Sequence, residues 1–295
     1  MASELSYLLR ILFRNLIHEF SVKKFRSPHP VGPETYCRDY FLSSLVEGYA
    51  EYADHYGISP FKRMLVDMND LHPGQLFLDN GCGRGEILFH ALEKGVGGIG
   101  IDYSWDAIEL TKEGLKARNL YADLVVADAI HLPFKDGVFD RSYAGDLLEH
   151  LTESFGTACL LEMVRTTKQS GKFLVHTCPN LNFDRYVAPF IKIFLHLVGR
   201  KEAWQRIKAH IECCGKVHVF TYNYPRLKKQ LRRIQNQFKV NAKCWLSNDL
   251  LRGGQHLHAR EIARFPLLKT LFDFIGKTPL NRILSNDMYI AGTRL

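Results

Sequence analysis

The sequence predicts an α/β fold in which a parallel sheet is covered by helices on both faces. From Gly74 onward, short apolar runs alternate with helix-like stretches, which is the pattern of parallel strands joined by crossover helices. A turn rich in glycine, "DNGCGRGE" at 79–86, directly follows the first of these runs. A chain of 295 residues, 46% hydrophobic and 24% charged, can bury one large core with additions. Ligands of such sheets bind at the carboxyl ends of the strands, so the site is expected there.

An N-terminal attachment precedes the domain. Residues 3–20 are expected to form an amphipathic helix, because one helical face carries Leu5, Leu8, Leu9, Leu12, Leu16 and Ile17. Three prolines and Gly32 break this pattern over 28–33, so residues 1–33 are predicted to be this helix and a linker. Residues 34–295 then form the domain. It begins with a predicted helix over 39–57, whose tyrosines are expected to serve in packing.

The elements of the domain follow in order along the chain. The predicted strands lie at 75–81, 97–104, 122–130, 139–146, 171–179, 239–247 and 287–295, and a further helix covers 221–238. Two stretches do not fit the alternation, at about 179–218 and 252–286. Both are expected to form helical cap insertions beside the ligand edge. Their apolar runs are too short to span a bilayer, but they can lie at a membrane surface or pack together as a lid.

The charge of the protein is unevenly distributed along the sequence, and this distribution indicates possible ligands. The net charge of +8 is concentrated between Arg185 and Arg260, where 16 lysines and arginines face three acids. This basic window can be a solvated surface, or it can meet a phosphate, a lipid headgroup layer or an acidic substrate.

The seven cysteines form no Cys-x-x-Cys pair and no cleavable signal pattern is present, so the chain is expected to be cytoplasmic and reduced. Cys213 and Cys214 have no further ligands at a zinc spacing and are expected to pack.

The glycine-rich turn and the acid before it indicate the kind of ligand. Gly81, Gly83 and Gly85 allow the strand to turn sharply into a helix while the backbone approaches a ligand closely. A dinucleotide-binding loop needs the same freedom. Asp79 distinguishes the two cases, because its carboxylate would repel a pyrophosphate and attract a ligand that carries an ammonium group. A nicotinamide oxidoreductase is therefore disfavoured.

Two further acids follow the next two strands. Asp102 ends the second apolar run, at the position where an acid accepts hydrogen bonds from ribose hydroxyls. Asp128 ends the third run and can accept a hydrogen bond from the exocyclic amine of an adenine. Each acid alone could be a helix cap. Because all three lie at neighbouring strand ends, we expect one contact each to an amino acid, a ribose and a base.

These segments resemble the successive motifs of class I S-adenosylmethionine-dependent methyltransferases, particularly the broad group that includes quinone-biosynthesis enzymes. The likeness covers about residues 74–180 through "LFLDNGCGRGE", "GIDYS", "VVADAIHLPFKDGVFDRSYAGDLLEHL" and "GKFLVHTCPN". It implies a Rossmann-like, seven-stranded sheet whose last strand is antiparallel. It also implies a site for S-adenosylmethionine formed by Asp79, Gly81, Cys82, Gly83, Gly85, Asp102, Tyr103, Asp128, Ala129, Asp146 and Leu147. Asn80 departs from the small or apolar residue common there, a change that we expect to be tolerated.

The sequence motifs indicate less clearly which residues bind the methyl acceptor. His150 and His218 fall where this group often places acceptor-side residues, and either can act as a base near pH 7 or can be a hydrogen-bonded structural histidine. Glu149 and the two histidines also resemble the metal-binding set of some RNA and quinone O-methyltransferases, but the spacing is loose and we expect no metal. Cys178 resembles the nucleophile of RNA cytosine methyltransferases, whose preceding Pro-Cys element is absent here, so a nucleophilic role is not expected.

The predicted function is therefore S-adenosylmethionine-dependent methyl transfer to a small or amphiphilic acceptor, which can be lipid-linked. Peripheral contact with a membrane surface is compatible with the cap. The alternatives are an RNA methyltransferase that uses the basic window, and a methyltransferase-like protein that binds the cofactor without catalysis. Nucleic acid is the less favoured partner, because no fingerprint of an RNA-binding module accompanies the basic residues.

Overall fold

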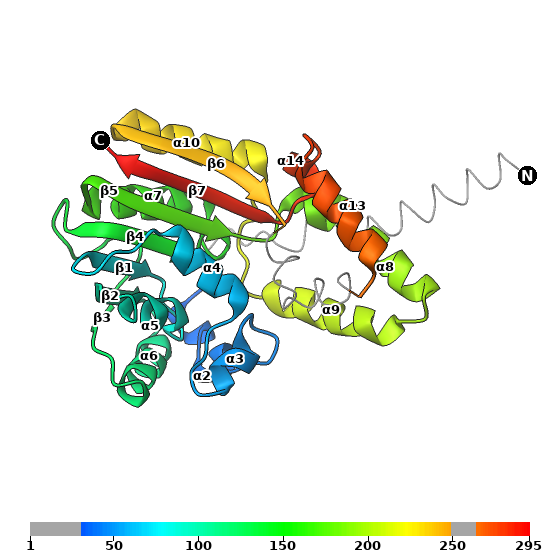
Figure 1. Ribbon diagram of the computed structural model, residues 1–295, viewed down its shortest axis with the longest axis horizontal. Coiled ribbons are helices and arrows are strands. Elements are labelled where there is room, and N and C mark those ends of the chain that lie inside the picture. The colour runs from blue at the N-terminus through cyan, green and yellow to red at the C-terminus, as the bar shows by residue number, and fades with distance from the viewer. Residues whose placement is uncertain (1–30, 249–263) are drawn as a thin grey trace, which may run out of the picture.

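The computed structural model describes residues 31–248 and 264–295, which are folded around one sheet (Figure 1). The strands are β1 (Leu76–Asn80), β2 (Gly97–Asp102), β3 (Asp123–Val126), β4 (Phe139–Gly145), β5 (Thr167–Thr177), β6 (Val240–Ser247) and β7 (Asp287–Arg294). The helices are α2 (Arg38–Phe41), α3 (Tyr49–Ala53), α4 (Pro60–Met68), α5 (Glu86–Leu92), α6 (Trp105–Ala117), α7 (Glu153–Thr166), α8 (Ala188–Leu197), α9 (Lys201–Cys214), α10 (Tyr224–Gln237), α13 (Pro266–Gly276) and α14 (Asn281–Leu284). The predicted N-terminal helix over 3–20 lies outside the described residues.

The sheet has seven strands in the order β3-β2-β1-β4-β5-β7-β6. Strands β1 to β5 pair in parallel, and β7 runs antiparallel to both β5 and β6. The predicted fold class, including an antiparallel last strand, is confirmed. Strand order reverses between β1 and β4, so the loops after these strands diverge and leave a crevice at their carboxyl ends.

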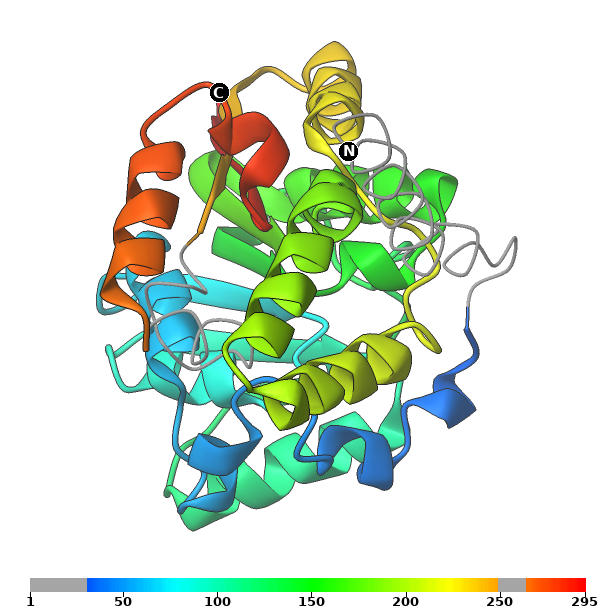
Figure 2. The ribbon, with the colours of Figure 1, turned by 90° about the vertical axis from the view of Figure 1, so that its right-hand side faces the viewer.

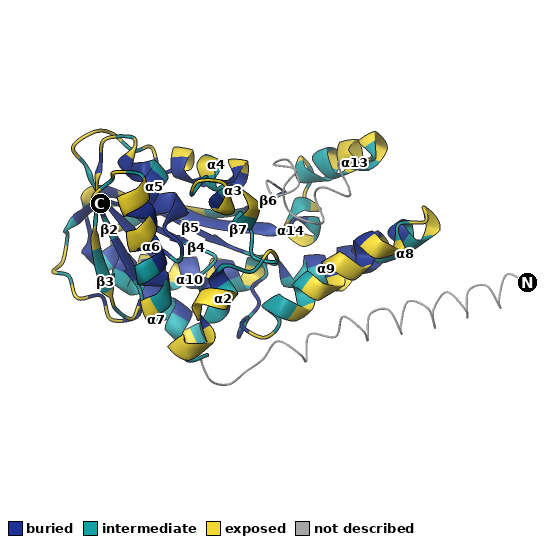
Figure 3. Ribbon diagram, turned by 90° about the horizontal axis from the view of Figure 1, so that it is seen from below, coloured by how far each residue is buried: buried dark blue, intermediate teal, exposed yellow. Residues whose placement is uncertain are grey.

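Helices cover both faces of the sheet, as Figures 1 and 3 show. On one face, α4 and α5 bury Phe61, Leu65 and Leu88 against β1 and its neighbours. On the other face, α7 and α10 bury an apolar stripe against β4, β5 and β7. Because both faces are covered, the central strands carry continuous apolar runs, and the buried polar groups in them stand out from their surroundings.

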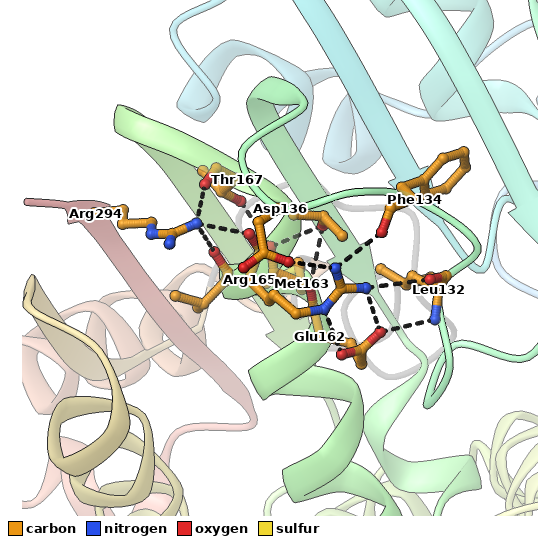
Figure 4. A network of polar contacts seen from close by, with 10 residues as sticks. Leu132, Phe134, Asp136, Glu162, Met163, Arg165, Thr167 and Arg294 are labelled. Carbon is orange, nitrogen blue, oxygen red and sulfur yellow. Dashed lines mark hydrogen bonds and ion pairs between the residues drawn. The ribbon is translucent and has the colours of Figure 1, made fainter.

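A polar network lies at the amino ends of the strands, away from the glycine-rich turn (Figure 4). Arg165, in the last turn of α7, donates hydrogen bonds to two carbonyls and two carboxylates, those of Leu132, Phe134, Asp136 and Glu162. Arg294, at the end of β7, donates to the carbonyls of Val164, Arg165 and Thr167. These contacts satisfy the carbonyls at the carboxyl end of α7, which have no partner within the helix. The network therefore fastens α7 to the last strand.

A helical cap extends beyond the carboxyl ends of the strands, where Figure 2 shows α8 and α9 in front of the sheet. A π-helical turn at Phe183–Val187 leads into α8, and α8 packs on α9 around Ile191, Trp204 and Ile207. Helix α13 adds Leu268 and Phe272 to this cluster, although none of its own residues is fully buried. Among the described residues, no helix combines the length and the apolarity needed to cross a membrane.

Two sequence expectations differ from the structure. The predicted helix over 39–57 is wrong, because α2 and α3 are short helices separated by a loop. Gly48 starts α3 with a φ of +76°, a left-handed conformation that cannot occur inside a helix. The third strand ends at Val126 instead of residue 130, so Asp128 lies in the loop after the strand.

Candidate functional site

A cavity of about 500 Å³ opens at the carboxyl ends of β1, β2, β4 and β5. Its wall combines the glycine-rich turn, the loops after β2, β3 and β4, the segment before α3, and the end of α9. Among the residues singled out from sequence, Asp79, Gly81, Cys82, Gly83, Asp102, Tyr103, Asp128, Ala129, Asp146, Leu147, His150 and His218 all line it. The fold thus brings the predicted donor-side and acceptor-side residues to one cavity.

The glycine-rich turn uses its three glycines for different reasons. All three have positive φ, at +83° for Gly81, +53° for Gly83 and +83° for Gly85. A Cβ on Gly85 would lie only 2.6 Å from Phe89 and 2.7 Å from Thr111, so this glycine allows α5 to pack on α6 and does not line the cavity. Gly81 and Gly83 do line the cavity. Only these two are placed to bring bare backbone against a ligand.

Asp79, at the carboxyl end of β1, is a buried acid with an unused acceptor. It is 1% exposed, and its Oδ2 has no hydrogen-bond partner among the described residues. Burial, together with the nearby charge of Asp102, raises the pKa of the Asp79 carboxyl to about 7. A buried, unpaired carboxylate is costly unless a ligand pairs with it. This side chain is therefore suited to accept hydrogen bonds from a cationic group in the cavity.

Asp102, at the end of β2, organises the turn around it. Its Oδ2 accepts a hydrogen bond from the Gly83 N–H at 3.0 Å, and its Oδ1 accepts one from the Ser104 N–H at 3.0 Å. Burial raises its pKa to about 6 although these backbone hydrogen bonds favour the anion. Each oxygen retains acceptor capacity, so two neighbouring ligand hydroxyls can bind it. Tyr103 lies beside it, with its hydroxyl donating to the Val31 carbonyl at 2.9 Å.

The loop after β3 supplies an exposed acid and a buried apolar residue. Asp128 is exposed, and its Oδ1 accepts a hydrogen bond from the Ile130 N–H at 3.1 Å. Ala129 is buried at the cavity wall. The loop is held beside β2 because the Ala127 N–H donates to the Asp102 carbonyl at 3.0 Å. Asp128 can therefore act both as a turn-forming residue and as an acceptor for a ligand amine.

The floor of the cavity contains a charged group that sequence reasoning missed. Asp146 follows β4 with a φ of +51°, and its Oδ1 lies 2.9 Å from Nδ1 of His176 on β5. Nε2 of His176 lies 3.5 Å from Oδ1 of Asp287 on β7. His176 and Asp287 are both completely buried. Although burial opposes it, the two carboxylates raise the pKa of His176 to about 10, so the imidazole is a cation that holds Asp146 as an anion.

His150 and His218 lie side by side in the cavity wall. Their rings meet edge to face with centroids 5.0 Å apart, and Nδ1 of His150 is hydrogen-bonded to the Tyr36 hydroxyl at 2.8 Å. Burial lowers the pKa of His150 to about 4 and that of His218 well below its usual value. Both imidazoles are therefore neutral at pH 7. Neutral rings can form hydrogen bonds to an acceptor, but with such a low pKa they are weak bases.

Two groups of side chains have the donor atoms for a metal ion. In one, the donor atoms of Glu149, His150 and His218 lie within 4.8 Å of one another, and in the other those of Asp146, His176 and Cys178 do so. In the first group, Thr177 donates to Oε2 of Glu149 at 2.6 Å, and one nitrogen of His150 is already engaged. Ligand sets of this kind suit Zn²⁺ or Mn²⁺ better than Ca²⁺. The expectation of no metal stays a prediction.

Cys178 and the sequence neighbours Cys213 and Cys214 are partly buried thiols. Sγ of Cys178 lies 3.6 Å from Oδ1 of Asp146, and burial together with this carboxylate raises its pKa well above the usual value. Burial likewise raises the pKa of Cys214. Since the thiolate is the nucleophile, Cys178 is poorly placed for covalent catalysis.

A second missed cluster lies between the glycine-rich turn and α4. Arg84 donates to Oε1 and Oε2 of Glu86 and to the carbonyls of Phe41 and Glu47. Lys62 donates to Oε2 of Glu86 at 2.8 Å. The sequence did contain a sign of this cluster. Arg84 and Glu86 are charged residues within the turn "GRGE", and bending the backbone does not by itself require charged side chains there. The cluster ties the turn to the segment before α3, which covers the cavity.

The basic window is largely separate from the cavity. No lysine or arginine between Arg185 and Ser247 lines it, whereas His210, Cys213 and His218 of the same stretch do. Helix α10 carries five of these basic residues, and it packs its apolar stripe of Leu227, Leu231 and Ile234 on the sheet. The described part of the window thus contributes no lysine or arginine to the cavity wall.

The buried ionisable groups predict a fall in stability with increasing pH. The folded-state pKa values of Asp79, Asp184, Glu149 and His176 are raised to about 7, 7, 8 and 10. A group with a raised folded-state pKa contributes stability at low pH that is lost as pH rises through that pKa. We expect the free energy of unfolding of the ligand-free protein to fall between pH 6.5 and 8, by about 1 kcal/mol per pH unit or more. Urea unfolding at pH 6.5, 7.2 and 8.0 measures this.

A matched pair of variants tests whether acids in the cavity cause the fall in the free energy of unfolding with increasing pH. Asp184→Asn removes one buried acid and is expected to make the decline shallower. Asp123→Asn removes an exposed acid at the start of β3 and is expected to leave the slope unchanged. A wild-type stability that rises over this interval would contradict the assignment of buried, protonated carboxyls.

Comparison with known proteins identifies the core of the domain. Residues 77–171 match the family model described as "Methyltransferase domain". The chain is similar to a probable tRNA methyltransferase 9B of Mus musculus, with 28% identity over 136 residues, covering 46% of this chain and 29% of the relative. It is also similar to the demethylmenaquinone methyltransferase of Paenarthrobacter aurescens (strain TC1), with 30% identity over 115 residues, covering 39% of this chain and 43% of the relative. The matches thus span less than half of the length of these relatives.

A solved structure extends the likeness to the whole fold. The structure of geranyl diphosphate methyltransferase in complex with SAM has a TM-score of 0.51 and 17% identity, covering 87% of this chain and 94% of that chain. At this identity the likeness concerns the fold alone. The relatives carry different acceptors in their names, so the acceptor of this chain has to be argued from its own cavity.

Proposed function

We propose that this chain, a member of the S-adenosylmethionine-dependent methyltransferases whose methyltransferase domain lies at 77–171, transfers the methyl group of that cofactor to a small or amphiphilic acceptor. The observation that carries the proposal is one continuous cavity, whose lining includes Asp79, Asp102 and Asp128 as well as the histidine pair and residues of the cap. A donor and an acceptor can therefore meet in a single cavity.

The donor side fits S-adenosylmethionine. The buried Oδ2 of Asp79 has no partner, which suits the ammonium group of the methionine part. Gly81 and Gly83 present bare backbone, and Asp102 can accept from both ribose hydroxyls. Asp128 and Ala129, with Tyr103, can bind the adenine. Asp146 and Leu147 form the floor of the cavity, where a Cβ on Gly81 would lie 3.2 Å from Leu147.

Methyl transfer from this cofactor requires few catalytic groups from the protein. The cofactor supplies a methyl group already activated by its sulfonium. The side chains must then align the acceptor with that methyl and exclude water. His150 and His218 are proposed to bind the acceptor by hydrogen bonds as neutral rings. Glu149, whose pKa burial raises to about 8, is largely protonated at pH 7 and becomes able to accept a proton from the acceptor as the pH rises towards 8.

The cap supports an amphiphilic acceptor. Its outer surface exposes large apolar side chains, with Leu197 on α8 81% exposed and Leu267 on α13 87% exposed, while Phe190 and Phe274 are exposed beside them. Two exposed basic residues belong to the same cap, Lys201 at the start of α9 and Lys269 on α13. Apolar groups with flanking cations are typical of surfaces that meet lipid headgroups. Peripheral membrane contact is therefore part of the proposal.

RNA is the second candidate acceptor, favoured only by the basic window. An RNA substrate would need cations that lead its phosphates to the cavity. The described basic residues of the window lie on surfaces outside it, and the cavity wall itself is acidic. This separation of charge weighs against RNA. A methyltransferase-like protein without catalysis is the third candidate, and the intact donor side weighs against it.

The test uses cofactor labelled in its methyl group, the purified full-length chain and a lysate of the source organism separated into lipids, small molecules and RNA. We expect label in the lipid or small-molecule fraction. Label in RNA alone would contradict a small or amphiphilic acceptor and would identify RNA as the acceptor. Binding of the cofactor with no label in any fraction would favour the non-catalytic alternative, and failure to bind the cofactor would contradict the proposal as a whole.

A further inference from the structure

We propose that the acceptor is an amphiphilic amine, recognised as a cation by carboxylates in the part of the cavity that the donor does not use. This inference rests on the proposed function, since it names the acceptor class of the same site. The observation behind it is the charge of the cavity wall. Eight carboxyl groups line the cavity, those of Glu47, Asp79, Glu86, Asp102, Asp128, Asp146, Glu149 and Asp184.

Among the residues that the structure describes, two lysine or arginine side chains line the same wall, and both are already paired. The guanidinium of Arg84 holds both oxygens of Glu86 and two backbone carbonyls. The ammonium of Lys62 pairs with Glu86 at 2.8 Å and lies 3.7 Å from Glu47. The single carboxylate of Glu86 thus engages both cations. A phosphate or carboxylate on the acceptor would meet no available cation among the described cavity residues.

Asp79, Asp102, Asp128 and Asp146 belong to the donor side and Glu86 pairs with the two cations, which leaves three carboxyls around the rest of the cavity. They come from three separate segments of the chain. Glu47 precedes α3, Glu149 lies in the turn before α7, and Asp184 lies in the π-helical turn that leads into the cap. Convergence of carboxyls from distant segments on one cavity is a tertiary arrangement, unlike a run of acids on one helix face.

Glu47 is a largely buried carboxyl in this part of the cavity wall. Its side chain is 16% exposed, and neither carboxylate oxygen has a hydrogen-bond partner among the described residues. Burial raises the pKa of this carboxyl although Lys62 opposes the shift. Lys62, 3.7 Å away, is shared with Glu86, so it compensates the charge of Glu47 only in part, and buried carboxylates normally also accept hydrogen bonds. An ammonium group, with up to three N–H donors, satisfies such an acceptor.

The same half of the cavity also has an apolar wall. Leu45 and Val46 lie beside Glu47, Phe183 lies beside Asp184, and Ile211 faces the cavity from α9. Apolar side chains around a charged subsite suit a ligand with a cationic head and a hydrocarbon body. A small hydrophilic amine would leave this surface without a partner.

The chemical step balances with the groups present. The ammonium group of the acceptor gives a proton to a neighbouring carboxylate, for which Asp184, a half-buried acid in the cavity wall, is available. The free amine nitrogen then forms a bond to the methyl carbon while the bond from that carbon to sulfur breaks, with its electron pair left on sulfur. The positive charge moves from sulfur to nitrogen, so the carboxylates remain paired with a cation throughout.

The experiment compares three probes that differ only in the head group: n-octylamine, n-octanol and n-octanoate. Each is titrated calorimetrically at pH 7.5 into the full-length protein saturated with S-adenosylhomocysteine. We expect n-octylamine to bind at least about 10-fold more tightly than n-octanoate, with n-octanol between them, because the cavity attracts a cation and repels an anion. Equal or tighter binding of n-octanoate, or no binding of n-octylamine, would overturn the inference.

Two variants test whether Glu47 is responsible for the preference for the amine probe. Glu47→Gln keeps the shape of the side chain and removes its charge, and we expect it to weaken n-octylamine binding roughly 10-fold with no change for n-octanol. Asp54→Asn removes one charge from a side chain that is 86% exposed outside the cavity, and we expect no change for either probe. Equal effects of the two variants would contradict a local subsite. Failure of the wild type to bind S-adenosylhomocysteine would instead contradict the proposed function.

Discussion

Replacing Asp102 by alanine is expected to raise the dissociation constant for S-adenosylmethionine by at least about 100-fold, as measured by isothermal titration calorimetry. Each hydrogen bond from a ribose hydroxyl to a carboxylate contributes about 1.5–3 kcal/mol, and two are lost together. The variant also removes the acceptor for the Gly83 and Ser104 N–H groups, so the glycine-rich turn loses its shape. Both effects act in the same direction.

Two companion variants separate these contributions. Asp102→Asn retains one oxygen acceptor and is expected to lose less affinity than the alanine variant. Asp123→Asn neutralises an acid at the opposite end of the neighbouring strand β3 and is expected to bind the cofactor as the wild type does. A dissociation constant for Asp102→Ala within threefold of the wild type, in a variant shown by circular dichroism to be folded, would remove this residue from the donor site.

Replacing His176 by leucine is expected to lower the free energy of unfolding by about 3–5 kcal/mol, measured by urea unfolding at pH 7. The imidazolium lies between Asp146 and Asp287, at 2.9 Å and 3.5 Å from their nearest oxygens. Its loss leaves two carboxylates near each other, one of them wholly buried, and removing one partner of a buried ion pair costs about this amount. Asp146 would also lose the group that holds it at the cavity floor.

A double variant distinguishes lost charge pairing from lost packing. His176→Leu combined with Asp287→Leu removes the cation together with its most buried anion, so it is expected to be less destabilised than His176→Leu alone. His72→Leu serves as the control, because His72 is 62% exposed and its pairing with Asp70 lies at the surface. A double variant less stable than the single one would show that packing, and not unpaired charge, determines the loss.

The donor side could be predicted from sequence because its signals are local. Asp79, Asp102 and Asp128 follow buried strands, and parallel strands bring their carboxyl ends to one edge whatever the loops between them do. The glycines of the turn are needed for backbone angles that neighbouring residues determine. The structure added that Gly85 is a packing residue, because its crowding comes from Phe89 and Thr111 on two different helices.

The acceptor side could not be predicted in the same way. Glu47, Lys62 and Asp184 carry no motif, and the predicted helix over 39–57 concealed that Glu47 lies in a loop at the cavity. Only the left-handed conformation of Gly48 shows where that helix is interrupted. His176 offered one signal, a histidine within the apolar strand "GKFLVHT", but its partner Asp287 lies more than a hundred residues away.

By itself, the sequence determined the α/β class, the order of the strands and the residues proposed for the donor side, since periodicity and strand-end residues act over short stretches of chain. Tertiary structure alone decided that the described part of the basic window lies outside the cavity wall, that Glu47, Glu149 and Asp184 come from separate segments to line one cavity, and that a buried histidine supports Asp146. The physical reason is that electrostatic interactions and desolvation depend on distance and burial in space, which sequence separation does not record.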